Sequence, residues 1–446
     1  MKELIQKYNV PGPRYTSYPT VPYWDAKSFS IDRWKESLIN NSSKELSLYI
    51  HLPFCESLCT FCACNKRITK RHEVEEPYIE ALLKEWSLYL EVLHEKPILK
   101  EIHLGGGTPT FFDADNLKVL IERIKASCIV PDEVQFSFEG HPNNTTEKHL
   151  NVLYQLGFDR VSYGIQDYNP KVQIAIHRIQ SFKTVKKITE LSRQIGYTSI
   201  SHDIIYGLPL QGLEDVISTI EKTIELKPDR IAFYSYAHVP WTKGNGQRGY
   251  DERDLPSADL KRLQYETGKK MLEDFGYMEI AMDHFALPED ELSKSFQDHT
   301  LHRNFMGYTT TKTSKMIGLG VSAISDSWFG FAQNKKDIKA YYQDLSQGLL
   351  SIEKGHILTE NDLKIRRKIL NLMCQFETDL SDLDIDMFID IKSDLKELEE
   401  DGLLIFEERN LLVTEKGQAF IRNICMAFDQ RLKAKQPETQ LFSMTI

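Results

Sequence analysis

The sequence predicts an α/β protein whose central part is a partial, TIM-like (β/α)6 barrel. Six strand-like apolar segments recur between residues 46 and 237, and helical patterns separate them. Parallel strands joined by helical crossovers produce this alternation. Of the 446 residues, 41% are hydrophobic and 27% are charged, which is the composition of a globular protein and not of a disordered chain. At this length we expect two or three domains.

The expected barrel elements follow one another in regular order. We expect strands at 46–53, 99–104, 133–139, 159–165, 199–206 and 230–237. We expect helices at 75–94, 114–127, 146–156, 181–195 and 212–226. In the third strand, apolar residues such as Phe136 and Phe138 alternate with polar ones ending at Glu139, so one face should pack against helices and the other should line a cavity. In such a barrel, functional residues gather at the C-terminal ends of the strands.

The expected domain boundaries divide the chain into four parts. They are an N-terminal arm (1–44) with one short helix near 31–38, the barrel (45–240), an irregular barrel extension (241–358) and a mostly helical C-terminal domain (359–446). In the last part, helices at 364–376 and 387–400 precede short strands at 403–407 and 411–414, an order that resembles a winged helix. The acidic run at 397–401 argues against DNA binding, so we interpret this domain as a packing or covering module.

Composition also restricts the partners and the compartment. The chain has 55 Lys and Arg against 65 Asp and Glu, a net charge of −10, which disfavours a nucleic-acid partner held by bulk charge. No apolar run is long enough for a transmembrane helix, and residues 1–20 contain no signal-like apolar stretch. Seven cysteines, an odd number, argue for reduced thiols. We therefore expect a cytoplasmic monomer with no membrane partner.

Four of the cysteines lie within ten residues, directly after the first expected strand. Cys55, Cys59 and Cys62 have the spacing C-x3-C-x2-C, and Cys64 follows. Three thiolates from one loop can hold a four-iron cluster with one iron left open, whereas an electron carrier normally uses four. A structural zinc site usually needs a second pair of ligands farther along the chain, so zinc is the lesser alternative. Cys64 is a possible fourth ligand, but it is only two residues from Cys62.

The cysteine spacing, with Phe61 before the third cysteine, resembles the radical S-adenosylmethionine (SAM) superfamily. Further segments are similar to one of its families, the oxygen-independent coproporphyrinogen III oxidases (dehydrogenases). These segments are 14–20, 64–66, 105–110, 203–209, 236–240, 282–285, 302–305 and 320–325. The resemblance covers nearly the whole chain and is weakest after residue 359.

The resemblance implies a particular chemistry. One [4Fe-4S] cluster, once reduced, cleaves SAM to methionine and a 5′-deoxyadenosyl radical, and that radical takes a hydrogen from the β-carbon of a propionate. Loss of carbon dioxide and one electron leaves a vinyl group. Applied to two propionates of coproporphyrinogen III, this anaerobic reaction gives protoporphyrinogen IX on the way to haem. The family also implies two bound SAM molecules, together with a reductant and an electron acceptor that the sequence does not identify.

The resemblance assigns roles to individual positions. The cluster ligands are Cys55, Cys59 and Cys62. The first SAM site is formed by Tyr49, Gly106, Glu139 and Ile324. The second SAM site is formed by Phe61, Gly107, Thr108, Gln166, Arg178, Asp203 and Ala237. Cys64, Arg14 and Tyr15 are assigned to catalysis, the last two in an arm that closes over substrate. Taken singly, Asp203 and Gln166 could be ordinary polar residues at strand ends, and Arg178 could be a surface residue.

Two positions depart from the family pattern. His141 stands before Pro142 where an acidic residue is expected, and Met306 stands where well-known members carry glutamine near the second SAM. A basic run at 66–72 could steer an anionic tetrapyrrole, or it could be the solvated start of a helix. The segment 14–20 has no regular pattern, so by itself it would be mobile.

Three other functions fit parts of this pattern. They are a haem-opening radical methyltransferase, a haem-binding chaperone on the same fold, and a non-catalytic iron–sulfur carrier. Cys64 and the arm favour the decarboxylase over the chaperone, which typically lacks both. An iron–sulfur carrier would not need the pattern of the SAM sites.

Overall fold

Six parallel strands form the barrel wall in chain order. The computed structural model describes residues 2–241, 246–247, 249–435, 437 and 439–445. The strands are β1 (Glu45–Leu52), β4 (Ile98–Gly106), β5 (Gln135–Gly140), β6 (Phe158–Gln166), β7 (Ser199–Tyr206) and β8 (Arg230–Ser235). Each one pairs in parallel with the next. Every strand lies where the sequence analysis expects one, so the predicted α/β barrel is confirmed.

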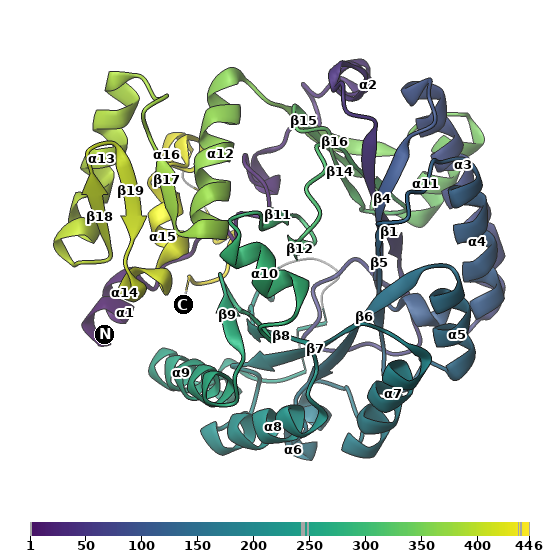
Figure 1. Ribbon diagram of the computed structural model, residues 1–446, viewed down its shortest axis with the longest axis horizontal. Helices are drawn as coiled ribbons and strands as arrows, with labels where there is room; N and C mark the ends of the chain where they lie inside the picture. The colour runs from purple at the N-terminus through teal and green to yellow at the C-terminus, as the bar shows by residue number, and fades with distance from the viewer. Residues whose placement is uncertain (1, 242–245, 248, 436, 438, 446) are drawn as a thin grey trace.

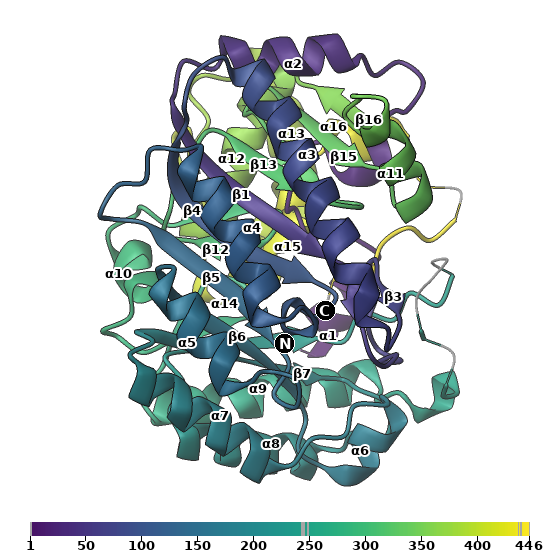
Figure 2. The same ribbon diagram turned by 90° about the vertical axis from the view of Figure 1, so that its right-hand side faces the viewer.

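Helices cover the outer face of this sheet (Figures 1 and 2). They are α3 (Glu75–Leu93), α4 (Ala114–Ala126), α5 (Glu147–Gln155), α6 (Pro170–Ala175), α7 (Phe182–Ile195) and α8 (Leu213–Leu226). Local signals set their ends: the Ser181 side chain accepts from the Thr184 N–H to start α7, and Gly196 at φ 119° ends it. The short helix α6, which the sequence analysis did not expect, starts at an Asn169 cap with proline in its first turn.

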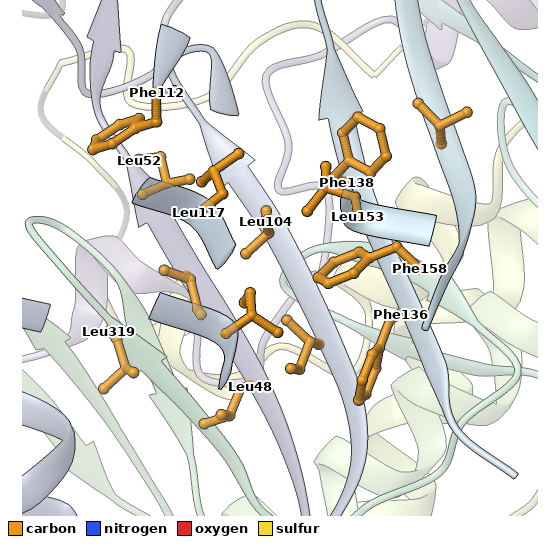
Figure 3. Close-up of a cluster of buried hydrophobic side chains, with 14 of the residues drawn as sticks. Leu48, Leu52, Leu104, Phe112, Leu117, Phe136, Phe138, Leu153, Phe158 and Leu319 are labelled. Carbon is orange, nitrogen blue, oxygen red and sulfur yellow. The ribbon is translucent and has the colours of Figure 1, made fainter. Parts of the chain in front are cut away.

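The main core lies between the strands and these helices. Leu48, Leu104, Phe138 and Phe158 come from four adjacent strands and are fully buried in one cluster (Figure 3). Because side chains alternate along a strand, the polar residues between them point to the other face. In β5 the buried and partly exposed positions alternate as expected. The barrel therefore has an apolar outer wall and a polar inner face.

The segment 241–358 contributes more regular structure than the sequence predicts. Strands β13 (Met316–Leu319), β14 (Ile324–Asp326), β15 (Gly330–Asn334) and β16 (Ile352–Ile357) extend the sheet beyond β1, and β10 (His284–Ala286) and β9 (Met278–Ile280) extend it beyond β8. The same segment forms η4 (Glu252–Asp254), α9 (Ala258–Asp274), α10 (Glu291–Gln297), the hairpin β11 (His302–Asn304) and β12 (Gly307–Thr309), and α11 (Ile338–Ser346). Most of these strands are too short to show an alternating pattern, and β13 pairs in parallel with a strand far away in sequence.

The C-terminal part forms a compact unit beside the barrel, shown in yellow-green in Figure 1. It contains α12 (Glu360–Gln375), β17 (Glu377–Asp379), α13 (Ile385–Glu400), β18 (Leu404–Glu407), β19 (Asn410–Val413), α14 (Glu415–Gln418), α15 (Ile421–Met426) and α16 (Gln430–Ala434). The expected helices and hairpin are present. An extra strand, β17, pairs with β19 to give a three-stranded sheet.

Residues 5–18 of the N-terminal arm pack into this C-terminal unit, whereas the last helix of the arm packs against the barrel and its sheet extension. The arm contains α1 (Lys2–Tyr8), η1 (Val21–Tyr23) and α2 (Ile31–Asn40). Tyr15 and Tyr18 are each only 2% exposed and belong to the C-terminal core cluster. Arg422 donates from Nε to the Pro13 carbonyl at 2.9 Å. Tertiary packing therefore orders a segment that has no periodic pattern of its own.

Candidate active site at the carboxyl ends of the strands

The cysteine loop is fixed on several sides as it leaves β1. Strand β2 (Phe54–Cys55) pairs in parallel with β3 (Arg67–Ile68), which closes the base of the loop. At its tip, the Thr60 N–H donates to the Ile176 carbonyl at 3.0 Å. Lys66 donates from Nζ to the Cys62 carbonyl at 2.9 Å, so this member of the basic run supports the loop. The loop is therefore held in one shape by backbone contacts that the sequence analysis did not anticipate.

Polar groups from two other segments point at the thiols. The Thr108 hydroxyl donates to Cys55 Sγ at 3.3 Å, and Arg178 donates from Nη1 to Cys59 Sγ at 3.7 Å. A hydrogen bond from Cys64 lowers the pKa of Cys62 to about 6. This environment favours the thiolate of Cys62, which is the form that binds metal, whereas burial raises the pKa of Cys55 to about 11. Arg178 and Thr108, which the resemblance assigns to the second SAM site, thus lie against the predicted cluster ligands.

The chemistry of the three thiols matches the predicted cluster. Cys55, Cys59 and Cys62 are free thiols, partly exposed on one loop. In a four-iron cluster held by three cysteines, each thiolate binds a different iron atom. The donor set fits the predicted [4Fe-4S] cluster.

The glycine turn after β4 presses directly against the cysteine loop. Gly106 has φ 113°, and a Cβ there would lie 2.7 Å from the His51 ring. A Cβ on Gly107 would lie 2.6 Å from the Pro53 backbone. The Gly107 N–H donates to the Leu52 carbonyl at 2.9 Å. Only glycine permits this approach, and it is the approach that places Thr108 beside Cys55.

Of the residues predicted for the first SAM site, Gly106 contacts Glu139, and Tyr49 and Ile324 are both neighbours of Gly318. The Gly106 N–H donates to Glu139 Oε2 at 3.2 Å, and His103 Nε2 lies 3.3 Å from Oε1. Burial raises the pKa of the Glu139 carboxyl, but these two hydrogen bonds together with the charges of His103 and His51 outweigh burial, and the net pKa is lowered. Tyr49 pairs with Gly318 across β1 and β13, and a Cβ on Gly318 would lie 2.4 Å from the Ile324 carbonyl oxygen. His103 is a functional candidate that the sequence analysis missed.

The residues predicted for the second SAM site form a connected set next to the first. Arg178 donates from Nη2 to the Gly164 carbonyl at 2.7 Å, two residues before Gln166, which lies at a bulge between β6 and β7 with φ 67°. Gln247, also missed from sequence, donates to the carbonyls of Phe61 at 2.9 Å and Ala237 at 3.0 Å. One side chain thereby joins the cysteine loop to the end of β8.

Asp203 lies on the inner face of β7, and its environment disfavours its charge. Burial raises the pKa of the Asp203 carboxyl to about 7, although Ser162 donates a hydrogen bond to it at 2.7 Å. The nearby Glu139 carboxylate raises this pKa further. Asp203 makes no ion pair with the residues that the structure describes, and a buried acid at the inner face of a barrel wall is more typical of a binding site than of a core.

The barrel interior contains a polar cavity of about 150 Å³. Glu139, His103 and Asp203 line it, and so does Met306. Met306 therefore places a thioether on a wall that otherwise presents mainly charged and hydroxyl groups. His141, the other departure, is kept neutral: burial and the nearby Arg178 lower its pKa to about 3.

The two arm residues assigned to catalysis occupy different environments. Arg14 donates to Asp283 Oδ2 at 3.3 Å and to the Ser235 carbonyl, the last residue of β8, at 3.2 Å. Tyr15 points away, into the C-terminal core, where its hydroxyl donates to Asp429 at 3.2 Å. The arm thus brings Arg14 to the barrel and leaves Tyr15 buried.

In the described part of the chain, none of the helices combines the length and apolarity needed to span a membrane.

Comparison with known proteins agrees with this geometry. The family model described as the radical SAM superfamily matches residues 49–223. The barrel, the cysteine loop and this match define a radical SAM protein, a class that uses an iron–sulfur cluster and SAM.

More specific similarity extends over the whole chain. Oxygen-independent coproporphyrinogen III oxidases from Pseudomonas aeruginosa and Escherichia coli are each 37% identical, over 96% and 99% of this chain and 95% and 98% of theirs. The solved structure of coproporphyrinogen III oxidase from Escherichia coli, described as a radical SAM enzyme, superposes with a TM-score of 0.91 at 35% identity and covers 97% of this chain and 99% of that one. The chain belongs to the family of oxygen-independent coproporphyrinogen III oxidases.

Proposed function

We propose that this chain catalyses the anaerobic oxidative decarboxylation of two propionates of coproporphyrinogen III to vinyl groups, giving protoporphyrinogen IX. The observation that carries the proposal is the convergence of residues from separate segments of the chain on one cysteine loop. Thr108 and Arg178 contact the thiols of Cys55 and Cys59 directly. Full-length similarity to named coproporphyrinogen III oxidases supports the choice of substrate.

Cys55, Cys59 and Cys62 would hold the [4Fe-4S] cluster, which together with SAM supplies the 5′-deoxyadenosyl radical. The chain's own residues then orient the ligands and keep water out. Glu139 accepts hydrogen bonds and can bind the amino group or ribose hydroxyls of SAM, while Arg178 suits its carboxylate. A closed site matters because a carbon radical reacts with whatever reaches it.

We further propose two SAM sites, with Tyr49, Gly106, Glu139 and Ile324 at the first. Phe61, Gly107, Thr108, Gln166, Arg178, Asp203 and Ala237 form the second. The support is spatial continuity, because the glycine turn belongs to both sets and the Gln247 amide joins Phe61 to Ala237. Equilibrium dialysis of cluster-loaded protein with labelled SAM tests this, since a ratio of one SAM per chain would contradict it.

Several further features of the reaction remain proposals. The seven free thiols suit a reducing, cytoplasmic setting. A monomer, an electron-donating reductant and an external electron acceptor complete the proposal. Cys64, exposed beside the predicted ligands, is proposed to act on the substrate and not on the cluster.

Anaerobic turnover with coproporphyrinogen III, SAM and a chemical reductant tests the function. We expect protoporphyrinogen IX, with methionine and 5′-deoxyadenosine as co-products. A methylated or ring-opened tetrapyrrole would instead indicate a radical methyltransferase. Tight haem binding without SAM cleavage would indicate a chaperone. Either of these outcomes would contradict the proposed function.

A further inference from the structure

A second, larger cavity opens beside the predicted SAM sites. It has a volume of about 400 Å³ and lies where the barrel, the arm and the C-terminal unit meet. Tyr206 and Ser235, the final residues of β7 and β8, form part of its wall. Arg14 enters from the arm and Arg422 from α15. The cavity thus lies on the functional face of the barrel, yet none of the residues assigned to SAM or the cluster lines it.

The cavity is positively charged, although the whole chain is acidic. Its lining includes six Lys or Arg side chains and four carboxylates. Two of the carboxylates are neutralised within the wall, by the ion pairs Arg262–Glu266 and Lys269–Glu279. Glu415 and Lys416 are adjacent in sequence and offset one another. Asp283 is then the one lining carboxylate left to face three cations, which are Arg14, Lys261 and Arg422.

Lys261 is positioned to bind an anion. Its stem lies against Gly207, where a Cβ would be 2.9 Å from Lys261 Cε. The ammonium donates to the Tyr236 carbonyl at 3.2 Å and makes no ion pair within the described part of the chain. Burial, together with Arg14 and Arg422, lowers the pKa of Lys261 to about 8. A bound carboxylate would supply the negative charge that this ammonium lacks.

The other two cations have carbonyl oxygens as their main partners. Arg422 is 5% exposed and donates to four backbone carbonyls, those of Pro13 at 2.9 Å, Met444 at 2.8 Å, Ser443 at 3.4 Å and Gly12. Arg14 shares its charge between Asp283 and the Ser235 carbonyl. Carbonyls satisfy hydrogen-bond donors without cancelling their charge, so the cavity keeps an excess positive potential. This positive potential acts on any ligand that occupies the cavity.

The cavity lies close to the reacting end of the site. Tyr236, which accepts from Lys261, is the residue before Ala237 in the predicted second SAM site. Through Gln247, Ala237 is joined to Phe61, the neighbour of Cys62. An anion held in the cavity would therefore be anchored at the ends of β7 and β8, which the Gln247 amide joins to the cysteine loop.

We propose that Arg14 and Lys261, in the positive field of Arg422, bind a propionate carboxylate of the anionic tetrapyrrole, one that is not reacting, and so hold the macrocycle in place for reaction at another propionate. This assignment rests on the proposed function, because it takes a tetracarboxylate as the ligand. It also gives the arm a specific task, since Arg14 completes the carboxylate site from outside the barrel.

Equilibrium binding without turnover tests the proposal. Coproporphyrinogen III is dialysed anaerobically against the cluster-loaded protein in the absence of SAM, and then oxidised to the fluorescent porphyrin for measurement. Lys261→Met keeps the stem over Gly207 and removes the charge. Lys270→Met is the matched control, because Lys270 lies on the same helix and is exposed in a pair with Asp274. Lys261→Arg tests whether charge alone restores binding.

We expect Lys261→Met to raise the Kd about tenfold to a hundredfold, as the loss of a charge-assisted hydrogen bond would. Lys270→Met should leave the Kd unchanged, and Lys261→Arg should recover most of the affinity. The tetramethyl ester of the ligand should bind wild type at least tenfold more weakly and should not respond to Lys261→Met. An unchanged Kd in Lys261→Met, or an ester that binds wild type equally well, would overturn the carboxylate site.

The binding result and the turnover result can be separated. If wild type forms vinyl product but Lys261→Met binds the tetracarboxylate with the same Kd as wild type, this site is contradicted and the proposed function stands. If Lys261→Met raises the Kd but wild type forms no vinyl product, this site is supported and the proposed function is contradicted.

Discussion

Replacing Tyr15 with phenylalanine separates two roles for the N-terminal arm. The sequence pattern assigns Tyr15 to substrate, whereas the structure buries it to 2% exposure with its hydroxyl on Asp429 Oδ2 at 3.2 Å. Tyr15→Phe keeps the ring and removes only that hydrogen bond. If the structure describes the role of Tyr15, the substitution should lower stability and leave the reaction of the folded enzyme unchanged.

The magnitude follows from the environment of Asp429. This carboxyl is fully buried, and its other oxygen accepts from the Leu432 N–H at 2.9 Å at the start of α16. Burial disfavours the charged form of Asp429 and raises its pKa, so each hydrogen bond donated to this carboxylate stabilises the folded state. A hydrogen bond to a charged group contributes about 1.5–3 kcal/mol, and the loss leaves a buried acceptor without its donor. We expect Tyr15→Phe to lower the free energy of unfolding by about 2 kcal/mol.

Tyr8→Phe is the matched control. In the parent protein the Tyr8 hydroxyl also donates to an aspartate, Asp401, at 2.6 Å, but that carboxylate is partly exposed and is paired with Lys7 as well. Exposed charged contacts contribute less than about 1 kcal/mol, so the control should lose much less stability. Urea unfolding followed by tryptophan fluorescence measures both variants, and vinyl product per SAM cleaved measures their chemistry.

One result would refute this reasoning. Tyr15→Phe could keep the stability of the parent protein and yet lose vinyl formation while still cleaving SAM. The hydroxyl would then act on the substrate as the sequence pattern indicates, and it would leave Asp429 during catalysis.

Three further predictions concern the site itself. Cys62→Ser should abolish cluster absorption and SAM cleavage, whereas Cys64→Ser should keep the cluster and lose porphyrinogen turnover. Burial raises the pKa of Asp203 to about 7, so the folded state retains a proton that the unfolded chain loses above about pH 4. Stability therefore falls as pH rises from 4 to 7, and Asp203→Asn should be the more stable protein at pH 8, by at most about 4 kcal/mol, while binding SAM more weakly. Gly107→Ala should disrupt the turn and reduce cluster content, whereas Gly212→Ala, which meets one side-chain oxygen at 3.5 Å, should not.

Each of these predictions has a result that would contradict it. Equal loss of cluster absorption in both cysteine variants would make Cys64 a ligand. Urea unfolding of Asp203→Asn that shows the same advantage over wild type at pH 4 and pH 8 would show that this carboxyl does not titrate in that window. Normal iron content and SAM binding in Gly107→Ala would mean that the glycine turn adjusts to a side chain.

The sequence alone predicts the barrel because its signals are local. Alternation in strands, helical periodicity and caps such as Ser181 are all contained in short stretches of chain, so the six strands and the main helices lie where expected. The cysteine spacing is equally local, since one loop carries Cys55, Cys59 and Cys62. For the same reason the polar inner face of β5, ending at Glu139, follows from its alternating pattern.

Only the tertiary structure decides which distant groups meet. Strand β13 joins the sheet beside β1, and the Gln247 amide joins the cysteine loop to the end of β8, through contacts between residues far apart in sequence. The arm has no pattern of its own, and Tyr15 is ordered by the C-terminal core. The cationic cavity likewise exists only after Arg14 and Arg422 are brought together by folding. Local patterns record the conformation of a segment, whereas burial and charge excess depend on its neighbours in space, and these are set by packing.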